Sequence, residues 1–293
     1  MEFEILIILA CVPLYVLNSF CDKIISTKQN NHFSNLYNFV KFFLVALCFL
    51  PMFLIDNSPK FTIGVIGCGI ACSILYSSSK IITIKGYETS SMTFINFCHG
   101  AGMLIPCVLG HFFWNEKLNL FSIAGIVLAI ISIVLLKDSS KNQNKVNLKG
   151  IIIGLLVFVT SGGIMIVQKL MGLYFVGESV SAYNFYSFFI SFIILGSFLV
   201  VKSKNEEKKN ITKKDAKKLI LCSIGSAVSL CVINFVMTTL SSSIPSVVLF
   251  PLFNGLGIVC VCVGSSILFK EKMTKKKVVG LIIGLIGLYL VNF

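Results

Sequence analysis

The stretch Phe113-Trp-Asn-Glu-Lys-Leu118 is repeated 155 residues later as Leu268-Phe-Lys-Glu-Lys-Met273. At the same offset upstream, His99-Gly100-Ala101-Gly102 corresponds to Asn254-Gly255-Leu256-Gly257. Two separate stretches that agree at one offset indicate an internal repeat. We therefore expect a chain built from two related halves.

Both copies of the repeat lie in strongly apolar sequence. Of the 293 residues, 56% are hydrophobic and 13% are charged, and the mean hydropathy is +0.92. Such a chain is too apolar for a water-soluble protein of this size. The apolar residues form blocks of roughly 20, the length that a helix needs to cross about 30 Å of hydrocarbon. The composition predicts an all-α integral membrane protein.

Apolar runs bounded by charged residues predict ten transmembrane helices. We place them at residues 3–23, 34–55, 61–83, 89–112, 118–136, 149–171, 178–201, 217–240, 243–269 and 276–292. The amino terminus lacks the positive region and the cleavage site of a signal peptide, so we expect it to remain as the first helix.

A polar run between the fifth and sixth helices divides the chain. We expect a first five-helix repeat over residues 1–137, a linker loop over 138–148 and a second five-helix repeat over 149–293. Because five is odd, the second half crosses the membrane in the opposite sense, which makes the repeats inverted. Inverted repeats place a shared site near the midplane, and rocking one half against the other exposes that site to alternate sides.

Each half ends in a turn that contains a glutamate, Asn115-Glu116-Lys117-Leu118 and Lys270-Glu271-Lys272-Met273, and in a helix that contains Gly125 or Gly280. With its two five-helix halves, the chain resembles the drug/metabolite transporter superfamily in its EamA-type branch. The resemblance implies ten helices, alternating access and substrates such as amino acids, amines or other small metabolites, very often exported. It implies a secondary transporter and no enzyme.

All 25 basic residues are lysines, and the net charge is +13. Because they lie mainly in short loops, we expect them to meet the lipid bilayer and set orientation, with no nucleic acid as partner. Helix counting puts Lys60, Lys117 and Lys169 on the face of both termini and the other 22 (25 minus 3) opposite. The positive-inside rule then predicts lysine-rich loops in the cytoplasm of a plasma-membrane protein. The resemblance implies the reverse, with both termini in the cytoplasm.

Polar groups inside a bilayer are costly, so each one is a candidate for the substrate site. His99 lies near the middle of the fourth helix, its repeat mate Asn254 near the middle of the ninth, and Asn96 one turn before His99. The candidates for substrate binding are His99, Asn96, Asn254, Tyr76, Asn234 and Tyr15. Aromatic rings with amide groups suit a neutral, zwitterionic or cationic small molecule. Alternatively, these groups only hold neighbouring helices together.

Charged residues are expected at the ends of helices. Lys41, Lys80, Lys85 and Lys169 lie close enough to the ends to extend toward the headgroups, and Asp22 lies at the end of the first helix. We therefore expect no buried carboxylate. For want of arginine or a central lysine, we also expect no strongly anionic ligand such as a phosphate ester.

The eleven cysteines form neither CxxC pairs nor a Cys/His cluster with zinc spacing, so we expect no metal site and no cofactor. The chain contains no HExxH, no GxSxG and no paired carboxylates inside a helix. An enzyme is therefore not expected. A membrane-embedded enzyme and a channel-like protein stay the alternatives to a carrier.

Two of the predicted helices contain an internal proline. Pro106 in the fourth helix and Pro251 in the ninth remove helix hydrogen bonds and permit kinks.

Small residues let helices approach closely, so we expect the fifth and tenth helices to pack together and to offer a surface for a homodimer. The small residues are Gly125, Ala129 and Ser132 in the fifth helix and Gly280, Gly284 and Gly287 in the tenth.

Overall fold

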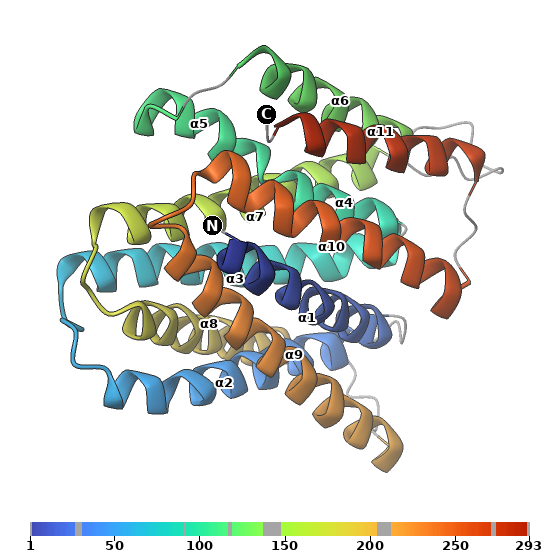
Figure 1. The fold of residues 1–293 in the computed structure, drawn as a ribbon. Coiled ribbons are helices and arrows are strands. Elements are labelled where there is room, and N and C mark those ends of the chain that lie inside the picture. The colour runs from blue at the N-terminus through green and yellow to red at the C-terminus, as the bar shows by residue number, and fades with distance from the viewer. Residues whose placement is uncertain are drawn as a thin grey trace.

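The structure, a computed structural model, describes residues 2–26, 31–90, 92–116, 119–136, 148–203, 212–270 and 274–291. In these ranges the secondary structure consists of helices, without strands (Figure 1). The helices are α1 (Glu2–Ser26), α2 (Asn31–Ile55), α3 (Ile63–Thr89), α4 (Met92–Ala101), α5 (Leu104–Trp114), α6 (Leu120–Leu136), α7 (Leu148–Tyr174), α8 (Val180–Ser203), α9 (Lys213–Leu240), α10 (Ser246–Leu268) and α11 (Lys275–Val291). The linker at 138–147, the turn residues 271–273 and much of the lysine-rich loops lie outside the described residues.

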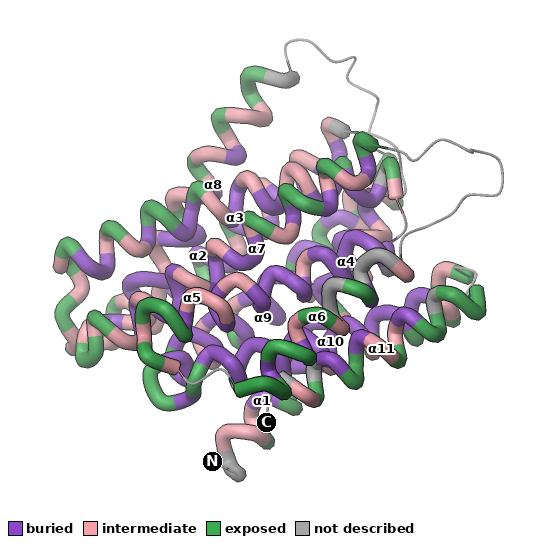
Figure 2. Tube along the Cα trace, turned by 90° about the horizontal axis from the view of Figure 1, so that it is seen from above, coloured by how far each residue is buried: buried purple, intermediate pink, exposed green. Residues whose placement is uncertain are grey.

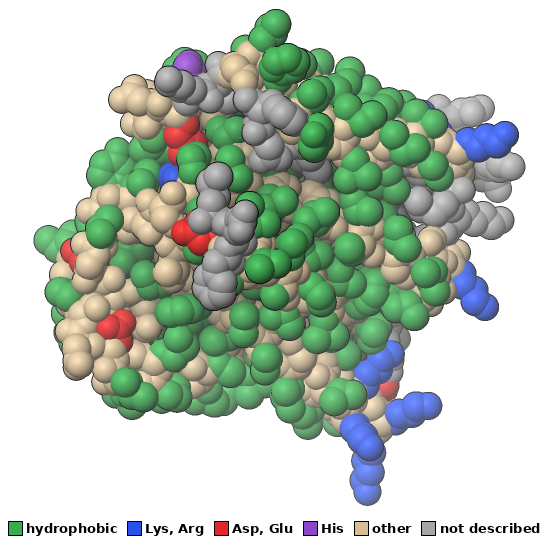
Figure 3. Space-filling view, viewed as in Figure 1, with side chains coloured by type: hydrophobic (Ala, Val, Ile, Leu, Met, Phe, Trp, Pro, Cys, Tyr) green, Lys and Arg blue, Asp and Glu red, His purple; other side chains and the backbone are tan. Residues whose placement is uncertain are grey.

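The helices have the length and composition of membrane spans. Within the described residues, eight segments are long and apolar enough to cross a membrane, with α4 and α5 joined as one. α6 and α11 have 17 residues each. Buried positions dominate α10 in the centre, whereas exposed positions recur along outer helices such as α8 (Figure 2). Hydrophobic side chains cover the middle of the face in Figure 3, with most of the lysines at one end and most of the carboxylates at the other. The predicted all-α membrane fold is confirmed.

The packing of the helices repeats between the two halves. α1 packs against α9 and α10, and its repeat mate α7 packs in the same way against α3 and α4. α2 packs against its own mate α8, and α6 against its own mate α11. Each of these contacts therefore either recurs between the repeat mates of its two helices or joins two helices that are mates of each other. The two-repeat membrane fold predicted from the sequence is confirmed, and a shared site belongs where the halves meet.

The fourth helix is broken, whereas the sequence predicted one helix over 89–112. Pro106 has no N–H to donate to the Gly102 carbonyl oxygen, which instead accepts a hydrogen bond from the Ile105 amide at 3.0 Å. Gly102 also lies against α7, where an added Cβ would come within 2.7 Å of the Gly162 amide nitrogen. The break therefore follows from a proline combined with a close approach between backbones. α10, the repeat mate, is continuous.

α6 and α11 pack against each other at the periphery of the molecule (Figure 1). The Ser132 hydroxyl donates a hydrogen bond of 2.6 Å to the Gly280 carbonyl oxygen. A Cβ on Gly284 would lie 2.6 Å from Ser132 Oγ, so a larger residue there would force the helices apart. Ser132 of α6 and the glycines Gly280 and Gly284 of α11 thus face each other inside the chain.

The turn after α5 joins three helices at the face where both termini lie. Both carboxylate oxygens of Glu116 accept hydrogen bonds from the Ser246 amide, at 3.0 and 3.1 Å, at the start of α10. A negative charge stabilises a helix N-terminus. Lys169 of α7 lies 3.2 Å from Glu116 Oε1 and donates to the Ile244 carbonyl oxygen at 3.0 Å. The expectation that Lys169 extends to the headgroups is wrong, because its ammonium finds these acceptors in the interior.

Candidate functional site

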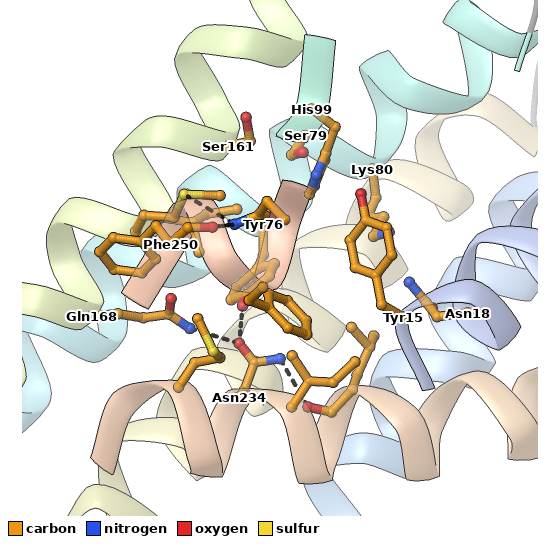
Figure 4. A pocket seen from close by; sticks show the side chains of 17 residues that line it. Tyr15, Asn18, Tyr76, Ser79, Lys80, His99, Ser161, Gln168, Asn234 and Phe250 are labelled. Carbon is orange, nitrogen blue, oxygen red and sulfur yellow. Dashed lines mark hydrogen bonds between the residues drawn. The ribbon is translucent and has the colours of Figure 1, made fainter. Parts of the chain in front are cut away.

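A cavity of about 80 Å³ lies between the two halves (Figure 4). Its lining comes from α1, α3 and α4 of the first half and from their repeat mates α7, α9 and α10 of the second. The volume suits a few ordered waters or a ligand of comparable size. The polar lining residues are Tyr15, Asn18, Tyr76, Ser79, Lys80, His99, Ser161, Gln168, Asn234 and Asn254. Apolar residues, among them Met165, Phe250 and Phe253, complete the wall.

The cavity brings together five of the six residues that the sequence singled out, namely His99, Asn254, Tyr76, Asn234 and Tyr15. The structure places the sixth, Asn96, outside the lining. Its Oδ1 accepts a hydrogen bond from the Tyr87 hydroxyl at 3.2 Å, and its Nδ2 donates to the Met92 carbonyl oxygen at 3.0 Å. Asn96 thus makes contacts within and between helices, as the alternative explanation described. A role of the other five in substrate binding stays a prediction.

His99 and Asn254, which correspond in the repeat, lie on α4 and α10, and these helices pack together where the halves meet. A Cβ on Gly100 would lie only 2.4 Å from Ile258 Cδ1 of α10, so glycine allows this approach. His99 Nδ1 is buried and has no hydrogen-bond partner. Asn254 Nδ2 donates to the Phe250 carbonyl oxygen at 3.0 Å. The two mates therefore differ: the asparagine is bonded to its own helix, and the histidine keeps a free nitrogen.

One end of the cavity is a hydrogen-bonded cluster of three residues, Tyr76, Gln168 and Asn234, which we call the amide end. Asn234 Oδ1 accepts hydrogen bonds from the Tyr76 hydroxyl and from Gln168 Nε2, the latter at 2.9 Å. Asn234 Nδ2 donates to the Leu230 carbonyl oxygen at 2.8 Å. None of these three side chains has a buried polar atom without a partner. The amide end therefore joins α3, α7 and α9.

The other end of the cavity, which we call the lysine end, consists of Lys80, Tyr15, Asn18, Ser79 and His99. In Figure 4, Lys80, Tyr15 and Asn18 lie across the cavity from Gln168 and Asn234. Four of its polar atoms are buried without a hydrogen-bond partner: Tyr15 OH, Asn18 Oδ1, Ser79 Oγ and His99 Nδ1. Buried polar groups are normally bonded, so this end has bonding capacity that the protein itself does not use.

Behind the lysine end lies a buried charge cluster around Asp22. Asp22 Oδ1 accepts hydrogen bonds from Lys41 Nζ at 2.6 Å and from the Tyr37 hydroxyl at 2.8 Å. Asp22 Oδ2 accepts one from Lys80 Nζ at 2.8 Å. The exposed fractions are 3% for Asp22, 0% for Lys41 and 7% for Lys80. The expectations of no buried carboxylate and of lysines that reach the headgroups are wrong here, because the Asp22 carboxylate pairs with both ammonium groups in the interior.

Helix geometry in the sequence could have revealed this end of the cavity. Tyr15, Asn18 and Asp22 are spaced by three and four residues, so they lie on one face of α1. Tyr76 and Lys80, four residues apart, lie on one face of α3 in the same way. Following the helix face from Tyr15 therefore leads to Asp22, and following it from Tyr76 leads to Lys80. Gln168 carries no comparable signal, because its partners come from other helices.

The side chains that line the cavity are suited to binding a small molecule. Among the residues that the structure describes, no cluster of three or more histidine, cysteine, aspartate or glutamate side chains could hold a metal ion. The described residues include all eleven cysteines, and none of them forms a disulfide bond. The cavity instead presents an ammonium group, hydroxyl and amide groups, and aromatic rings. Such a set can hold and orient a small polar molecule.

Comparisons with known proteins agree with this architecture. The model of the EamA-like transporter family matches residues 3–137 and 148–293. Among solved structures, one crystal structure of a protein superposes with a TM-score of 0.71, covering 99% of this chain and 96% of that chain at 8% sequence identity. At that identity the likeness concerns the fold alone. No curated protein matches the sequence significantly.

Proposed function

The chain belongs to the EamA-like transporter family, and from that premise we propose that it is a secondary transporter of a small polar metabolite. In this proposal one site between the halves opens alternately to the two sides of the membrane. The observation that carries the proposal is the cavity itself. Three helices of one half and their three repeat mates line it, so a motion of one half against the other would change its access.

Two features of the packing support such a motion. Glu116, Lys169 and Ser246 connect the end of α5, α7 and the start of α10 at the face where both termini lie. Opening the cavity toward that face would break this network. The turn at Gly102 separates α4 from α5, so α5 can move while His99 of α4 stays at the cavity. Broken helices beside a binding site are a recurrent feature of transporters with inverted repeats.

We place the chain in the plasma membrane with its lysine-rich loops in the cytoplasm and both termini outside. Lys41, Lys80 and Lys169 are buried, so these three do not contribute to the asymmetry between loops. Lys60, between α2 and α3, still counts on the face of the termini. A reporter that is active only in the cytoplasm, fused to the carboxyl terminus, tests the orientation. Weak activity supports it, and strong activity would reverse it.

Reconstitution tests the proposed transport. The purified protein is first screened by thermal shift against amino acids, amines, nucleosides and vitamins, and each compound that stabilises it is then measured for uptake into proteoliposomes. A carrier shows saturable uptake that unlabelled substrate inside the vesicles accelerates. Uptake that does not saturate would indicate a channel, and conversion to a product would indicate an enzyme. Liposomes without protein are the control.

A further inference from the structure

We propose that the lysine end of the cavity is a carboxylate-binding subsite, so that the ligand of this chain is a small monocarboxylate held by Lys80 and Tyr15. The statement that this ligand is also transported rests on the proposed function. Binding can be tested without it.

The charge of the buried cluster is the first argument. Two ammonium groups, of Lys41 and Lys80, contact the single carboxylate of Asp22, at 2.6 and 2.8 Å. Among the described residues, no other carboxylate pairs with either lysine. One positive charge is therefore left over in a region that is almost closed to solvent. Because an uncompensated buried charge is costly, an anionic group in the cavity would stabilise the protein.

The position of the two lysines decides where this anion would bind. Lys80 lines the cavity, whereas Lys41 does not. An ammonium group has three N–H donors, and Lys80 uses one of them on Asp22 Oδ2. Among the described residues, its remaining donors have no hydrogen-bond acceptor. A ligand carboxylate beside Lys80 would accept from them in a charge-assisted hydrogen bond, which is about twice as strong as a neutral one.

Unpartnered atoms around Lys80 fit the rest of such a ligand. The Tyr15 hydroxyl is buried without a partner and can donate to the second carboxylate oxygen. Asn18 Oδ1 is a buried acceptor without a donor, which suits a hydroxyl or amino group on the same molecule. Phe250, Phe253 and Met165 offer an apolar surface for a short carbon chain. At the amide end, the Tyr76 hydroxyl and Gln168 Nε2 already donate to Asn234 Oδ1.

Charge and size favour a monocarboxylate over other charged ligands. A phosphate ester carries up to two negative charges and is best held by the forked donors of arginine, which the sequence lacks. An organic cation would meet the charge of Lys80 at short range. A cavity of about 80 Å³ leaves room for only a few heavy atoms. This proposal departs from the earlier expectation of a neutral, zwitterionic or cationic ligand, because it requires a carboxylate that faces Lys80.

Three probes with the same carbon chain test the subsite: propionate, propionamide and propylamine, which are anionic, neutral and cationic near neutral pH. Each is titrated through the millimolar range into the full-length protein in detergent, and sodium chloride keeps the ionic strength equal. We expect propionate alone to raise the melting temperature with a saturating dependence on concentration. An equal response to all three probes, no response to propionate, or a preference for propylamine would overturn the proposal.

Variants locate the effect at the lysine end. Lys80→Gln removes the charge that faces the cavity and leaves Asp22 paired with Lys41, so we expect propionate to bind about tenfold more weakly or worse. Lys85→Gln, at an exposed lysine five residues further along α3, is the matched control and should bind as the unmodified chain does. Unchanged affinity in Lys80→Gln would contradict the proposal.

A second variant decides the question if Lys80→Gln does not fold. Tyr15→Phe removes a hydroxyl that has no partner in the protein, so its folding should be unaffected. We expect it to weaken propionate binding about threefold, the effect of losing one neutral hydrogen bond. Unchanged propionate affinity in Tyr15→Phe would then overturn the proposal.

The same proteoliposomes separate this inference from the proposed function. If propionate binds but shows no saturable uptake, the subsite stands and the transport proposal fails. If uptake is saturable only for compounds without a carboxylate, the transport proposal stands and the subsite is rejected.

Discussion

The two ends of the cavity contain similar residues and use them differently. Each has a tyrosine and an asparagine, Tyr76 with Asn234 at the amide end and Tyr15 with Asn18 at the lysine end. At the amide end the tyrosine donates to the asparagine, and Gln168 completes the cluster. At the lysine end both side chains have a buried atom without a partner beside a charge that is not fully balanced. The comparison teaches that residue type alone does not separate a group that holds helices together from one that is available to a ligand.

The largest expected effect is on the charge cluster behind the lysine end. Asp22→Asn leaves two buried ammonium groups without their carboxylate, and removing one partner of a buried ion pair costs about 3–5 kcal/mol. We expect a strongly lowered melting temperature in detergent or a loss of folded protein. Asp215→Asn changes a half-buried carboxylate that accepts a hydrogen bond from the Thr212 hydroxyl at the start of α9, and it should lower the melting temperature much less. Equal stability of the two variants would show that the cluster does not contribute to folding.

The second largest expected effect is a difference in stability between variants of Asn234 and Asn18. Asn234→Leu leaves the Tyr76 hydroxyl and Gln168 Nε2 without their acceptor, and each buried orphan costs about 1–3 kcal/mol. Asn18→Leu removes an oxygen that has no donor, so its cost should stay below about 1 kcal/mol. Melting temperatures of both variants, measured in one detergent without ligand, check the order. A larger loss for Asn18→Leu would mean that the lysine end holds the fold.

The smallest effect compares the two tyrosines, and it sharpens the contrast most. Tyr76→Phe deletes one hydrogen bond to Asn234 and should cost about 1 kcal/mol. Tyr15→Phe deletes a hydroxyl without a partner and should leave the melting temperature of the ligand-free protein almost unchanged. A loss of stability for Tyr76→Phe but not for Tyr15→Phe would show that the first hydroxyl holds helices together and that the second is available to a ligand. Equal losses would indicate that the Tyr15 hydroxyl is bonded in the folded protein.

Much of the fold could be predicted from the sequence, because the hydrophobic blocks and the repeat are local patterns. The broken fourth helix could not. Pro106 indicated a kink, but the position of the turn depends on the contact of Gly102 with Gly162 of α7, which is 60 residues away in the chain. The amide end shows the same limit, since Gln168 acquires its meaning only from Asn234 on another helix.

The charge cluster was missed for a different physical reason. A charged residue ends an apolar run, so the first helix was predicted to stop at residue 23, with Asp22 at its end. α1 continues to Ser26, and the carboxylate is buried because Lys41 and Lys80 reach it from α2 and α3. A hydropathy scale assigns each charged residue an unfavourable transfer energy of its own, whereas in the folded protein Asp22 pairs with Lys41 and Lys80. Tyr15 and Tyr76 could be predicted because each is a polar group inside a predicted transmembrane helix.

Access to the cavity from the two sides of the membrane tests the central claim most directly. Asn18→Cys at the lysine end and Gln168→Cys at the amide end are made separately in a chain whose eleven native cysteines are replaced. Each variant is then treated with a membrane-impermeant maleimide from either side of sealed proteoliposomes. Alternating access predicts that both cysteines react from either side. Reaction of Asn18→Cys from one side only and of Gln168→Cys from the opposite side only would contradict the account, because the two ends would then belong to separate pockets.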